Sequence, residues 1–317
     1  MSQPNGAHGP LVLAPIHIEE LNRVFSDTFT DRYHRDGMTG VRVPELSPAI
    51  WRFAMDSAGA GAMHWRDPQG RLAAFNLAHV SGQEGWMGPL AVRPDWQRRG
   101  LGGAIVMAAV ERLRQAGCRT IGLETMPRTV DNIGFYSRLG FRPGHLTVAM
   151  VRDVRRNEGA PAELATSLGP PDGWLGDARA LAEAVLPGAD FTREIGLTLA
   201  QSLGDLTVVR RGGRWAGYAV WHSAPLAAGR VPEEIRILKI VAEDPPAFRA
   251  VLEGAICEAG VRGLGRVAVR AQSAFRGAYG DLIDLGFRVH WTDLRMSLAA
   301  HPERHPATGV LFSNWEI

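Results

Sequence analysis

Residues 90–116 hold the pattern that most restricts the fold of this chain. An apolar run at 90–92 leads into a polar loop, and a helical pattern follows with apolar residues at Leu101, Ile105, Ala109 and Leu113. Apolar residues that recur every four positions mark one buried face of a helix. The segment therefore predicts a strand, a tight turn and a helix in immediate succession, a unit that is typical of α/β chains.

The turn predicted at 97–104 has the properties of a site for phosphate oxygens. The first N–H groups of a helix have no intrahelical partner, and the helix N-terminus carries about half a positive charge. Glycine, present at 100, 102 and 103, lets a ligand approach the backbone closely. A dinucleotide fingerprint is excluded because it needs a glycine where Ile105 stands, and a P-loop is excluded because it needs a lysine that this loop lacks.

Periodicity and turn residues predict a mixed order of elements in the first half of the chain. Pro15 opens a helical pattern, and the turn at 67–70 separates the two strands of a β-hairpin. We expect helices at 15–29, 47–56, 101–116 and 132–139, and strands at 11–13, 61–65, 72–80, 86–92, 120–125 and 146–150.

A proline- and glycine-rich cluster at 169–173 interrupts the pattern, and residues 156–173 are predicted to be a linker. Beyond it the order of elements begins again, and Leu-Gly-Phe-Arg at 139–142 recurs at 285–288. We therefore predict two tandem copies of one α/β fold with a mixed sheet, at 1–155 and 174–317. In the second copy we expect helices at 177–185, 192–203, 247–258 and 278–285, and strands at 206–210, 215–222, 235–241, 266–270 and 289–298.

Composition excludes several classes of protein. The 317 residues include 35 basic and 33 acidic side chains, and a net charge of +2 predicts neither nucleic acid nor an acidic membrane surface as a partner. No apolar stretch reaches the ~18 residues of a membrane helix, and no secretory signal is visible. Cys118 and Cys257 have neither zinc-ligand nor disulfide spacing. We expect a cytoplasmic protein with no metal site.

Two motifs closely resemble the GNAT superfamily, the Gcn5-related N-acetyltransferases. Residues 97–102, Gln-Arg-Arg-Gly-Leu-Gly, fit the family's acyl-CoA motif, and 135–141, Phe-Tyr-Ser-Arg-Leu-Gly-Phe, resemble its later signature. The resemblance covers residues 10–150 and implies an acyl-CoA N-acyltransferase fold that uses acetyl-CoA as acyl donor. The repeated order of elements and the Leu-Gly-Phe-Arg echo extend it to two tandem copies of that fold. It implies a cofactor site made by Leu90, Ala91, Val92, Gln97, Arg98, Arg99, Gly100, Leu101, Gly102, Gly103, Ala104 and Asn132.

In this resemblance the backbone N–H groups of 98–104 bind the pyrophosphate, and strand 90–92 pairs with the pantetheine arm and polarises the thioester carbonyl. Asn132 stands for the family's asparagine, whose usual position is occupied by Thr129. Tyr136 is predicted to stabilise or protonate the leaving thiolate, since a phenol with a pKa near ~10 can donate to sulfur. Glu84 is the predicted base, with Glu124, His79 or ordered water as alternatives.

The predicted second copy departs from the phosphate-site pattern. Its corresponding loop at 242–247 contains two carboxylates, which repel anions, and two prolines, which have no backbone N–H to donate. Leu282 stands at the position that Tyr136 occupies in the first copy. We predict a degenerate copy that completes the acceptor pocket, so that the chain is a monomeric pseudo-dimer or a homodimer. The C-terminal residues 312–317 are predicted to pack against a core.

The resulting prediction is an N-acetyltransferase that moves acetyl from acetyl-CoA to a primary amine of a small molecule by direct attack. Two alternatives stay open: acetylation of a protein N-terminus or lysine, and a non-catalytic acyl-CoA-binding sensor. The polar stretch 31–36, predicted to follow the first helix, is either part of the acceptor wall or a solvated loop.

Overall fold

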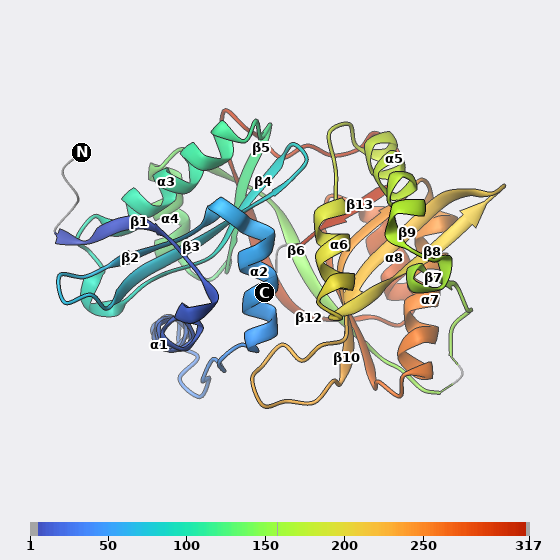
Figure 1. Cartoon of the computed structure of the whole chain (residues 1–317), viewed down its shortest axis with the longest axis horizontal. Coiled ribbons are helices and arrows are strands. Elements are labelled where there is room, and N and C mark those ends of the chain that lie inside the picture. The colour runs from blue at the N-terminus through green and yellow to red at the C-terminus, as the bar shows by residue number, and fades with distance from the viewer. Residues whose placement is uncertain (1–5, 157, 315–317) are drawn as a thin grey trace.

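The computed structural model describes residues 6–156 and 158–314, in two halves that lie side by side (Figure 1). Within these residues the N-terminal half contains six strands and four α-helices, two helices on one face of the strands and two on the other. Its elements are β1 (His8–Val12), α1 (Ile18–Arg35), α2 (Pro48–Ala58), β2 (Ala62–Arg66), β3 (Leu72–Ser81), β4 (Glu84–Val92), α3 (Leu101–Gln115), β5 (Thr120–Thr125), α4 (Val130–Arg138) and β6 (Phe141–Asp153).

The second half repeats much of this order. Its elements are β7 (Glu163–Leu164), α5 (Leu175–Val185), α6 (Thr192–Ala200), β8 (Gly204–Arg211), β9 (Arg214–His222), β10 (Glu234–Ala242), α7 (Pro245–Val261), β11 (Arg266–Gln272), α8 (Arg276–Asp284), β12 (Arg288–Leu298) and β13 (Val310–Ser313).

Most predicted elements are present, with four differences. The predicted linker at 156–173 contains the short strand β7, which pairs with β8. Residues 31–35 form the last turns of α1 rather than a loop after it. Strand β6 begins at Phe141 instead of 146. Strand β13 lies where the sequence predicts only a packed end, and Phe312 in it is 1% exposed; residues 315–317 of that prediction lie outside the described residues.

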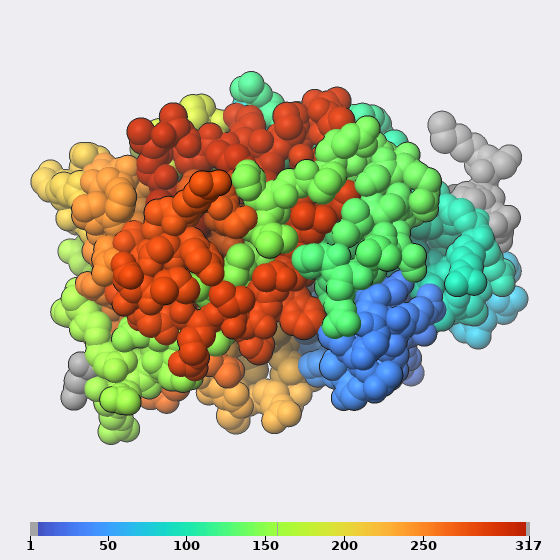
Figure 2. Space-filling view, turned by 180° about the vertical axis from the view of Figure 1, so that it is seen from behind, coloured from blue at the N-terminus to red at the C-terminus, as the bar shows by residue number. Residues whose placement is uncertain are grey.

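The strands form one mixed sheet in which the two halves exchange their long final strands. The order along the sheet is β1-β2-β3-β4-β5-β12-β6-β11-β10-β9-β8-β7, with β13 beside β10. Strand β12 of the second half therefore pairs with β5, and β6 of the first half pairs with β11. Seen from behind, red and orange atoms of the second half lie directly against green atoms of the first (Figure 2).

Helices cover both faces of this sheet. The stripe predicted on α3 is confirmed, since Leu101, Ile105, Ala109 and Leu113 are all at most 1% exposed and belong to one core with β3 to β5. The opposite face of the same strands packs on α1 and α2. In the second half α7 and α8 cover one face and α5 and α6 the other. Within the described residues no helix combines the length and apolar character needed to cross a membrane.

Two pairs of parallel strands have matching geometry in the two halves. Strands β4 and β5 pair in parallel from Glu84 and Thr120 to Met87 and Leu123. Strands β10 and β11 pair in parallel from Glu234 and Arg266 to Ile237 and Val269. Each pair of strands thus stays together for four residues and then separates. Residues 88–92 in the first half correspond to 238–242 in the second.

Candidate active site

The glycine-rich turn at 97–100 lies between the short 3-10 helix Pro94–Trp96, which follows β4, and the start of α3. Its backbone has positive φ at Arg98 (61°) and at Gly100 (80°), the latter being the residue that precedes the helix. No side chain caps α3, and the first turn of the helix carries no acidic residue. The turn therefore presents helix N–H groups and the positive end of the helix dipole to a ligand, as the sequence predicts.

Nearby side chains fix the position of this turn. Gln97 donates from Nε2 to the carbonyl of Val92 (2.9 Å) and accepts from Arg35 of α1 (3.1 Å). The guanidinium of Arg99 lies 5.0 Å from the centre of the Trp96 ring. A Cβ atom at Gly102 would be 3.4 Å from the ring of Phe135, which brings the start of α3 against α4. The turn and the helix that carries Tyr136 are thus packed together.

A cavity of about 470 Å³ opens where β4 and β5 separate. Leu90 is the predicted strand residue that lines it, together with Gly88 and Pro89 of the same strand. Ala91 and Val92 continue β4 toward the glycine-rich turn and are buried. The other lining residues come from α1 and the loop after it, from β4, from β5 and the residue after it, from α4, and from the central strands β6, β11 and β12: Phe25, Phe29, Arg32, Tyr33, Val43, Trp86, Met87, Leu123, Glu124, Thr125, Met126, Asn132, Tyr136, Ala149, Arg270, His290, Trp291 and Asp293.

Tyr136 and Asn132 both line this cavity from α4. The ring of Tyr136 packs edge-on against Phe141, with 6.1 Å between ring centres, and the residue is 9% exposed. Burial raises the pKa of Tyr136 to about 12. The phenol therefore keeps its proton at neutral pH and can act as a hydrogen-bond donor in the cavity.

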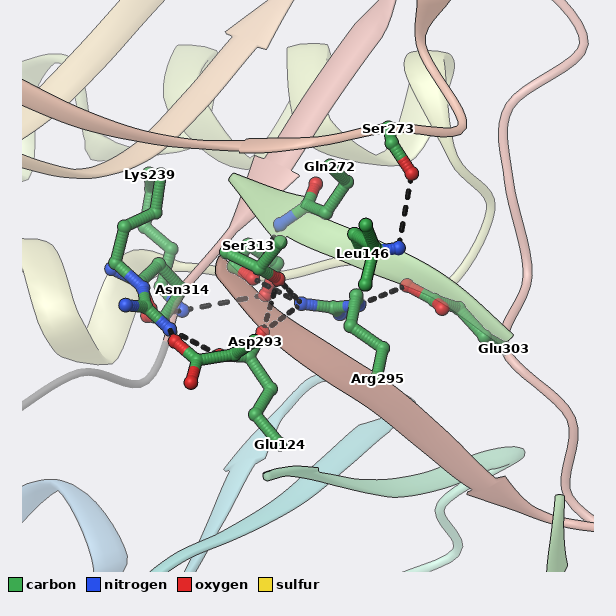
Figure 3. A network of polar contacts seen from close by, with 12 residues as sticks. Glu124, Leu146, Lys239, Gln272, Ser273, Asp293, Arg295, Glu303, Ser313 and Asn314 are labelled. Carbon is green, nitrogen blue, oxygen red and sulfur yellow. Dashed lines mark hydrogen bonds and ion pairs between the residues drawn. The ribbon is translucent and has the colours of Figure 1, made fainter. Parts of the chain in front are cut away.

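Three charged residues that line the cavity, Glu124, Arg270 and Asp293, form its floor, and Figure 3 shows the network of polar contacts around Glu124 and Asp293. Glu124 of β5 accepts hydrogen bonds from Arg270 of β11 and from Arg295 of β12. Arg270 also forms an ion pair with Asp293, at 2.9 Å. Burial alone would raise the pKa of Glu124, but the two arginines outweigh it and the pKa is lowered. Glu124 is therefore ionised at neutral pH.

The other two predicted bases lie elsewhere. Glu84 begins β4, is 2% exposed, and is not among the described residues that line the cavity. Burial raises its pKa, and the groups that act on it include Arg295, Lys239 and Ser313 of the second half. His79 of β3 is fully buried and donates to the carbonyl of Gly88 (3.1 Å), which fixes β4 at the point where it leaves β5.

Arg270, Trp291 and Asp293 are cavity residues that sequence reasoning missed. They belong to the second half, on β11 and β12, and reach the cavity only because the halves exchange strands. Trp291 donates from Nε1 to Asp293 (3.2 Å), and its ring lies 6.0 Å from that of Tyr33. The prediction that the second copy lines the acceptor pocket would have directed attention to these strands, but no local motif marks the residues.

The corresponding site of the second half is closed in two ways. Asp244 caps α7 by accepting from the N–H of Ala247 (2.9 Å), and its carboxylate pairs with Arg211. Residues 239–242 of β10 pair with β9 on one edge and with β13 on the other. Strand β13 therefore lies along the edge that corresponds to 89–92 of β4, which in the first half borders the cavity.

The N-terminal half matches a known family. Residues 19–141 match the model of the acetyltransferase (GNAT) family. Over 72 residues the chain is 36% identical to the [ribosomal protein bS18]-alanine N-acetyltransferase of Escherichia coli strain K12. That segment is 23% of this chain and 49% of the relative, so the chain spans about half the length of the curated relative it matches.

Two solved structures resemble the whole chain in fold. A putative acetyltransferase from Pyrococcus horikoshii has a TM-score of 0.69 and 14% identity, covering 98% of this chain and 95% of its own. A tandem GNAT protein from the clavulanic acid biosynthesis pathway has a TM-score of 0.60 and 14% identity, covering 94% of this chain and 100% of its own. At these identities the likeness concerns the mixed α/β fold.

Proposed function

We propose that this chain, whose residues 19–141 match the acetyltransferase (GNAT) family, transfers acetyl from acetyl-CoA to a primary amine of a small molecule. The observation that carries the proposal is that β4 connects the cavity to the glycine-rich turn. Its Leu90 lines a cavity that also contains Tyr136, the strand ends at Val92, and the short 3-10 helix Pro94–Trp96 joins it to the uncapped turn at the head of α3. A donor with a diphosphate and a reactive thioester fits this arrangement.

The donor substrate is bound by backbone rather than by side chains. The N–H groups of 98–104 receive the diphosphate, and Arg98 and Arg99 add positive charge beside it. The pantetheine arm lies along the edge of β4 that β5 leaves at Met87. Asn132, which donates to Thr125 (3.4 Å) at the end of β5, lines the opposite side of the cavity.

Transfer proceeds by direct attack. The lone pair of the neutral amine adds to the thioester carbonyl carbon, and a backbone N–H of 90–92 stabilises the developing oxyanion by about 3 kcal/mol. The carbon–sulfur bond then breaks, and the Tyr136 hydroxyl donates a proton to the departing sulfur. The positively charged nitrogen of the adduct loses one proton to water beside Glu124, and solvent returns a proton to the Tyr136 phenolate, so charge and atoms balance.

The carboxylate that is placed to receive the amine proton is Glu124. It lines the cavity with Tyr136, and its lowered pKa keeps it ionised so that it attracts an incoming ammonium group. Because its own affinity for a proton is weak, it acts on the amine through ordered water. Glu84, the base predicted from sequence, stays an alternative that the variants described below distinguish.

We assign the acyl donor to the N-terminal copy at 1–155, with 156–173 as linker and 174–317 as a copy that binds no acyl-CoA. The second copy contributes Arg270, Trp291 and Asp293 to the acceptor side of the cavity. This contribution is what a second subunit would supply in a dimer, and it supports a monomeric pseudo-dimer.

A protein N-terminus is the second candidate acceptor, because the Escherichia coli relative is named for a protein substrate. The cavity volume of about 470 Å³ lies in the range of small-molecule sites, which favours a small acceptor. A non-catalytic acyl-CoA sensor is the third candidate. It would be stabilised against heat by acetyl-CoA without releasing thiol for any amine.

An assay of thiol release tests the proposal. Purified protein and acetyl-CoA are mixed with a panel of small primary amines and with peptides that begin with alanine, and the Tyr136→Phe variant is run beside the wild type. The proposal expects release with a small amine and loss of release in Tyr136→Phe. Release with peptides alone would favour the second candidate, and thermal stabilisation without release would favour the sensor.

A further inference from the structure

Buried polar side chains form hydrogen bonds with the backbone at the end of β13 and at the residue that follows it. Ser313 and Asn314 are 2% and 4% exposed, and the carbonyl of Ser313 accepts from Gln272 (2.9 Å). The carbonyl of Asn314 accepts from Lys239 (2.8 Å), and its N–H donates to the carbonyl of Leu238 (3.1 Å). These contacts use backbone atoms of β13, so they depend little on which side chain stands at 314.

The side chain of Asn314 has a different partner. Its Oδ1 accepts a hydrogen bond from Nε of Arg270 at 3.0 Å. The same guanidinium donates from Nη2 to Glu124 and to Asp293. The Nε atom of Arg270 therefore binds Asn314, which directly follows β13, while its Nη2 atom binds two carboxylates that line the cavity.

The geometry of arginine makes this contact consequential. The guanidinium is planar and its N–H groups point in fixed directions, so a partner at Nε determines the plane in which Nη2 donates. Without that partner the guanidinium loses one of the contacts that fix its plane, and its hydrogen bonds from Nη2 to Glu124 and Asp293 are less firmly oriented. Each carboxylate also has a second donor, Arg295 for Glu124 and Trp291 for Asp293, so a change at Arg270 shifts both carboxylates without releasing either.

We propose that Asn314 is a positioning residue for the amine acceptor, acting through Arg270 on Asp293 and Glu124. The inference rests on the proposed function, since it assigns the acceptor to this cavity. It gives the C-terminal strand a second role besides filling the open edge of β10: the strand sets the charged floor of a site that is formed mainly by the other half of the chain.

Kinetics of three variants test the role in binding. Asn314→Ala removes the acceptor for Arg270, Asn314→Asp keeps one, and Ser313→Ala changes the neighbouring side chain without touching Arg270. With tyramine, glucosamine and an alanine-initiated peptide as probes, Asn314→Ala is expected to raise the acceptor KM at least fivefold. Its kcat and its Kd for acetyl-CoA stay within twofold of wild type, Asn314→Asp restores the KM, and Ser313→Ala leaves it unchanged.

Two further measurements separate positioning from loss of structure. Lys239 is the single lysine of the chain, and its buried Nζ donates to the carbonyl of Asn314. An amine-reactive ester can reach Nζ only if β13 is displaced, so modification of Lys239 reports that displacement. Lys239 is expected to stay protected in Asn314→Ala. Hydrogen exchange at Nε of Arg270, assigned by NMR from the signal lost in Arg270→Lys, is expected to accelerate about tenfold in Asn314→Ala only.

Three results would overturn the inference: an unchanged KM in Asn314→Ala, an unchanged Arg270 exchange rate, or a raised KM accompanied by labelling of Lys239. If the wild type releases no thiol with any of the three probes, the proposed function fails instead. The exchange rate then still decides, without any acceptor, whether Asn314 holds Arg270.

Discussion

Leu123 pairs with Met87, and this is the last pair that joins β5 to β4. The corresponding last pair of the second half is Val269 with Ile237. Beyond the first pair lies a cavity lined by Tyr136, and beyond the second lies β13. The same arrangement of strands thus borders a cavity in the first half and is covered by β13 in the second half.

A charge placed at the head of α3 tests the donor site. Gly102→Asp puts a carboxylate among the helix N–H groups, so the Kd for acetyl-CoA is expected to rise at least tenfold, because anions repel phosphate. Gly176→Asp is the matched control, since Gly176 lies in the first turn of α5 with open space around it. Isothermal titration measures both variants. Equal affinity for the two would mean that the turn does not bind the donor.

Removal of one hydroxyl tests the proposed acid. Tyr136→Phe is expected to lower kcat by about 100-fold, which is the low end for general acid catalysis, with the Kd for acetyl-CoA unchanged. Because burial raises the pKa of Tyr136 to about 12, the wild-type rate should show no decline from this group below about pH 11. Tyr279→Phe, on α8 of the second half, is the control. Wild-type turnover in Tyr136→Phe would remove the phenol from the mechanism.

Two carboxylate variants distinguish the candidate bases. Glu124→Gln is expected to lower kcat/KM at least tenfold, since it removes the ionised group of the cavity floor. Glu84→Gln is expected to keep kcat/KM within threefold, because Glu84 does not line the cavity. The reverse pattern in thiol-release assays would restore Glu84 as the base that the sequence predicts.

The difference in stability between Glu84→Gln and the wild type should depend on pH in a defined direction. Burial raises the folded-state pKa of Glu84 above its unfolded value, so its stabilising contribution is present at low pH and is lost as pH rises through the folded-state pKa. Glutamine has no such dependence. The melting temperature of Glu84→Gln relative to wild type should therefore increase from pH 5 to pH 9, and thermal scans at fixed ionic strength measure it. A difference that is constant across this range would contradict the burial of a protonated carboxyl.

Local patterns predicted the local structure well. The four apolar residues of α3 and the limits of β5 follow from periodicity within a few residues, and the glycine-rich turn needs only its own sequence to form. The placement of Leu90, Asn132 and Tyr136 around one cavity follows the family resemblance, and their roles there stay predictions.

Pairing between distant strands could not be predicted from such patterns. The exchange of β6 and β12 joins residues more than a hundred positions apart, and no periodicity encodes a partner. Arg270 and Asp293 are cavity residues only because of this exchange. Glu84 illustrates the same limit, since a sequence places it on β4 but does not tell which end of the strand opens to a ligand.

A crystal structure of the protein with acetyl-CoA tests the central claim most directly. We predict one molecule per chain, with its diphosphate on the N–H groups of 98–104, its pantetheine arm along residues 88–92, and β13 still paired with β10. A diphosphate bound at the head of α7, or anywhere else with the turn before α3 left vacant, would contradict this account.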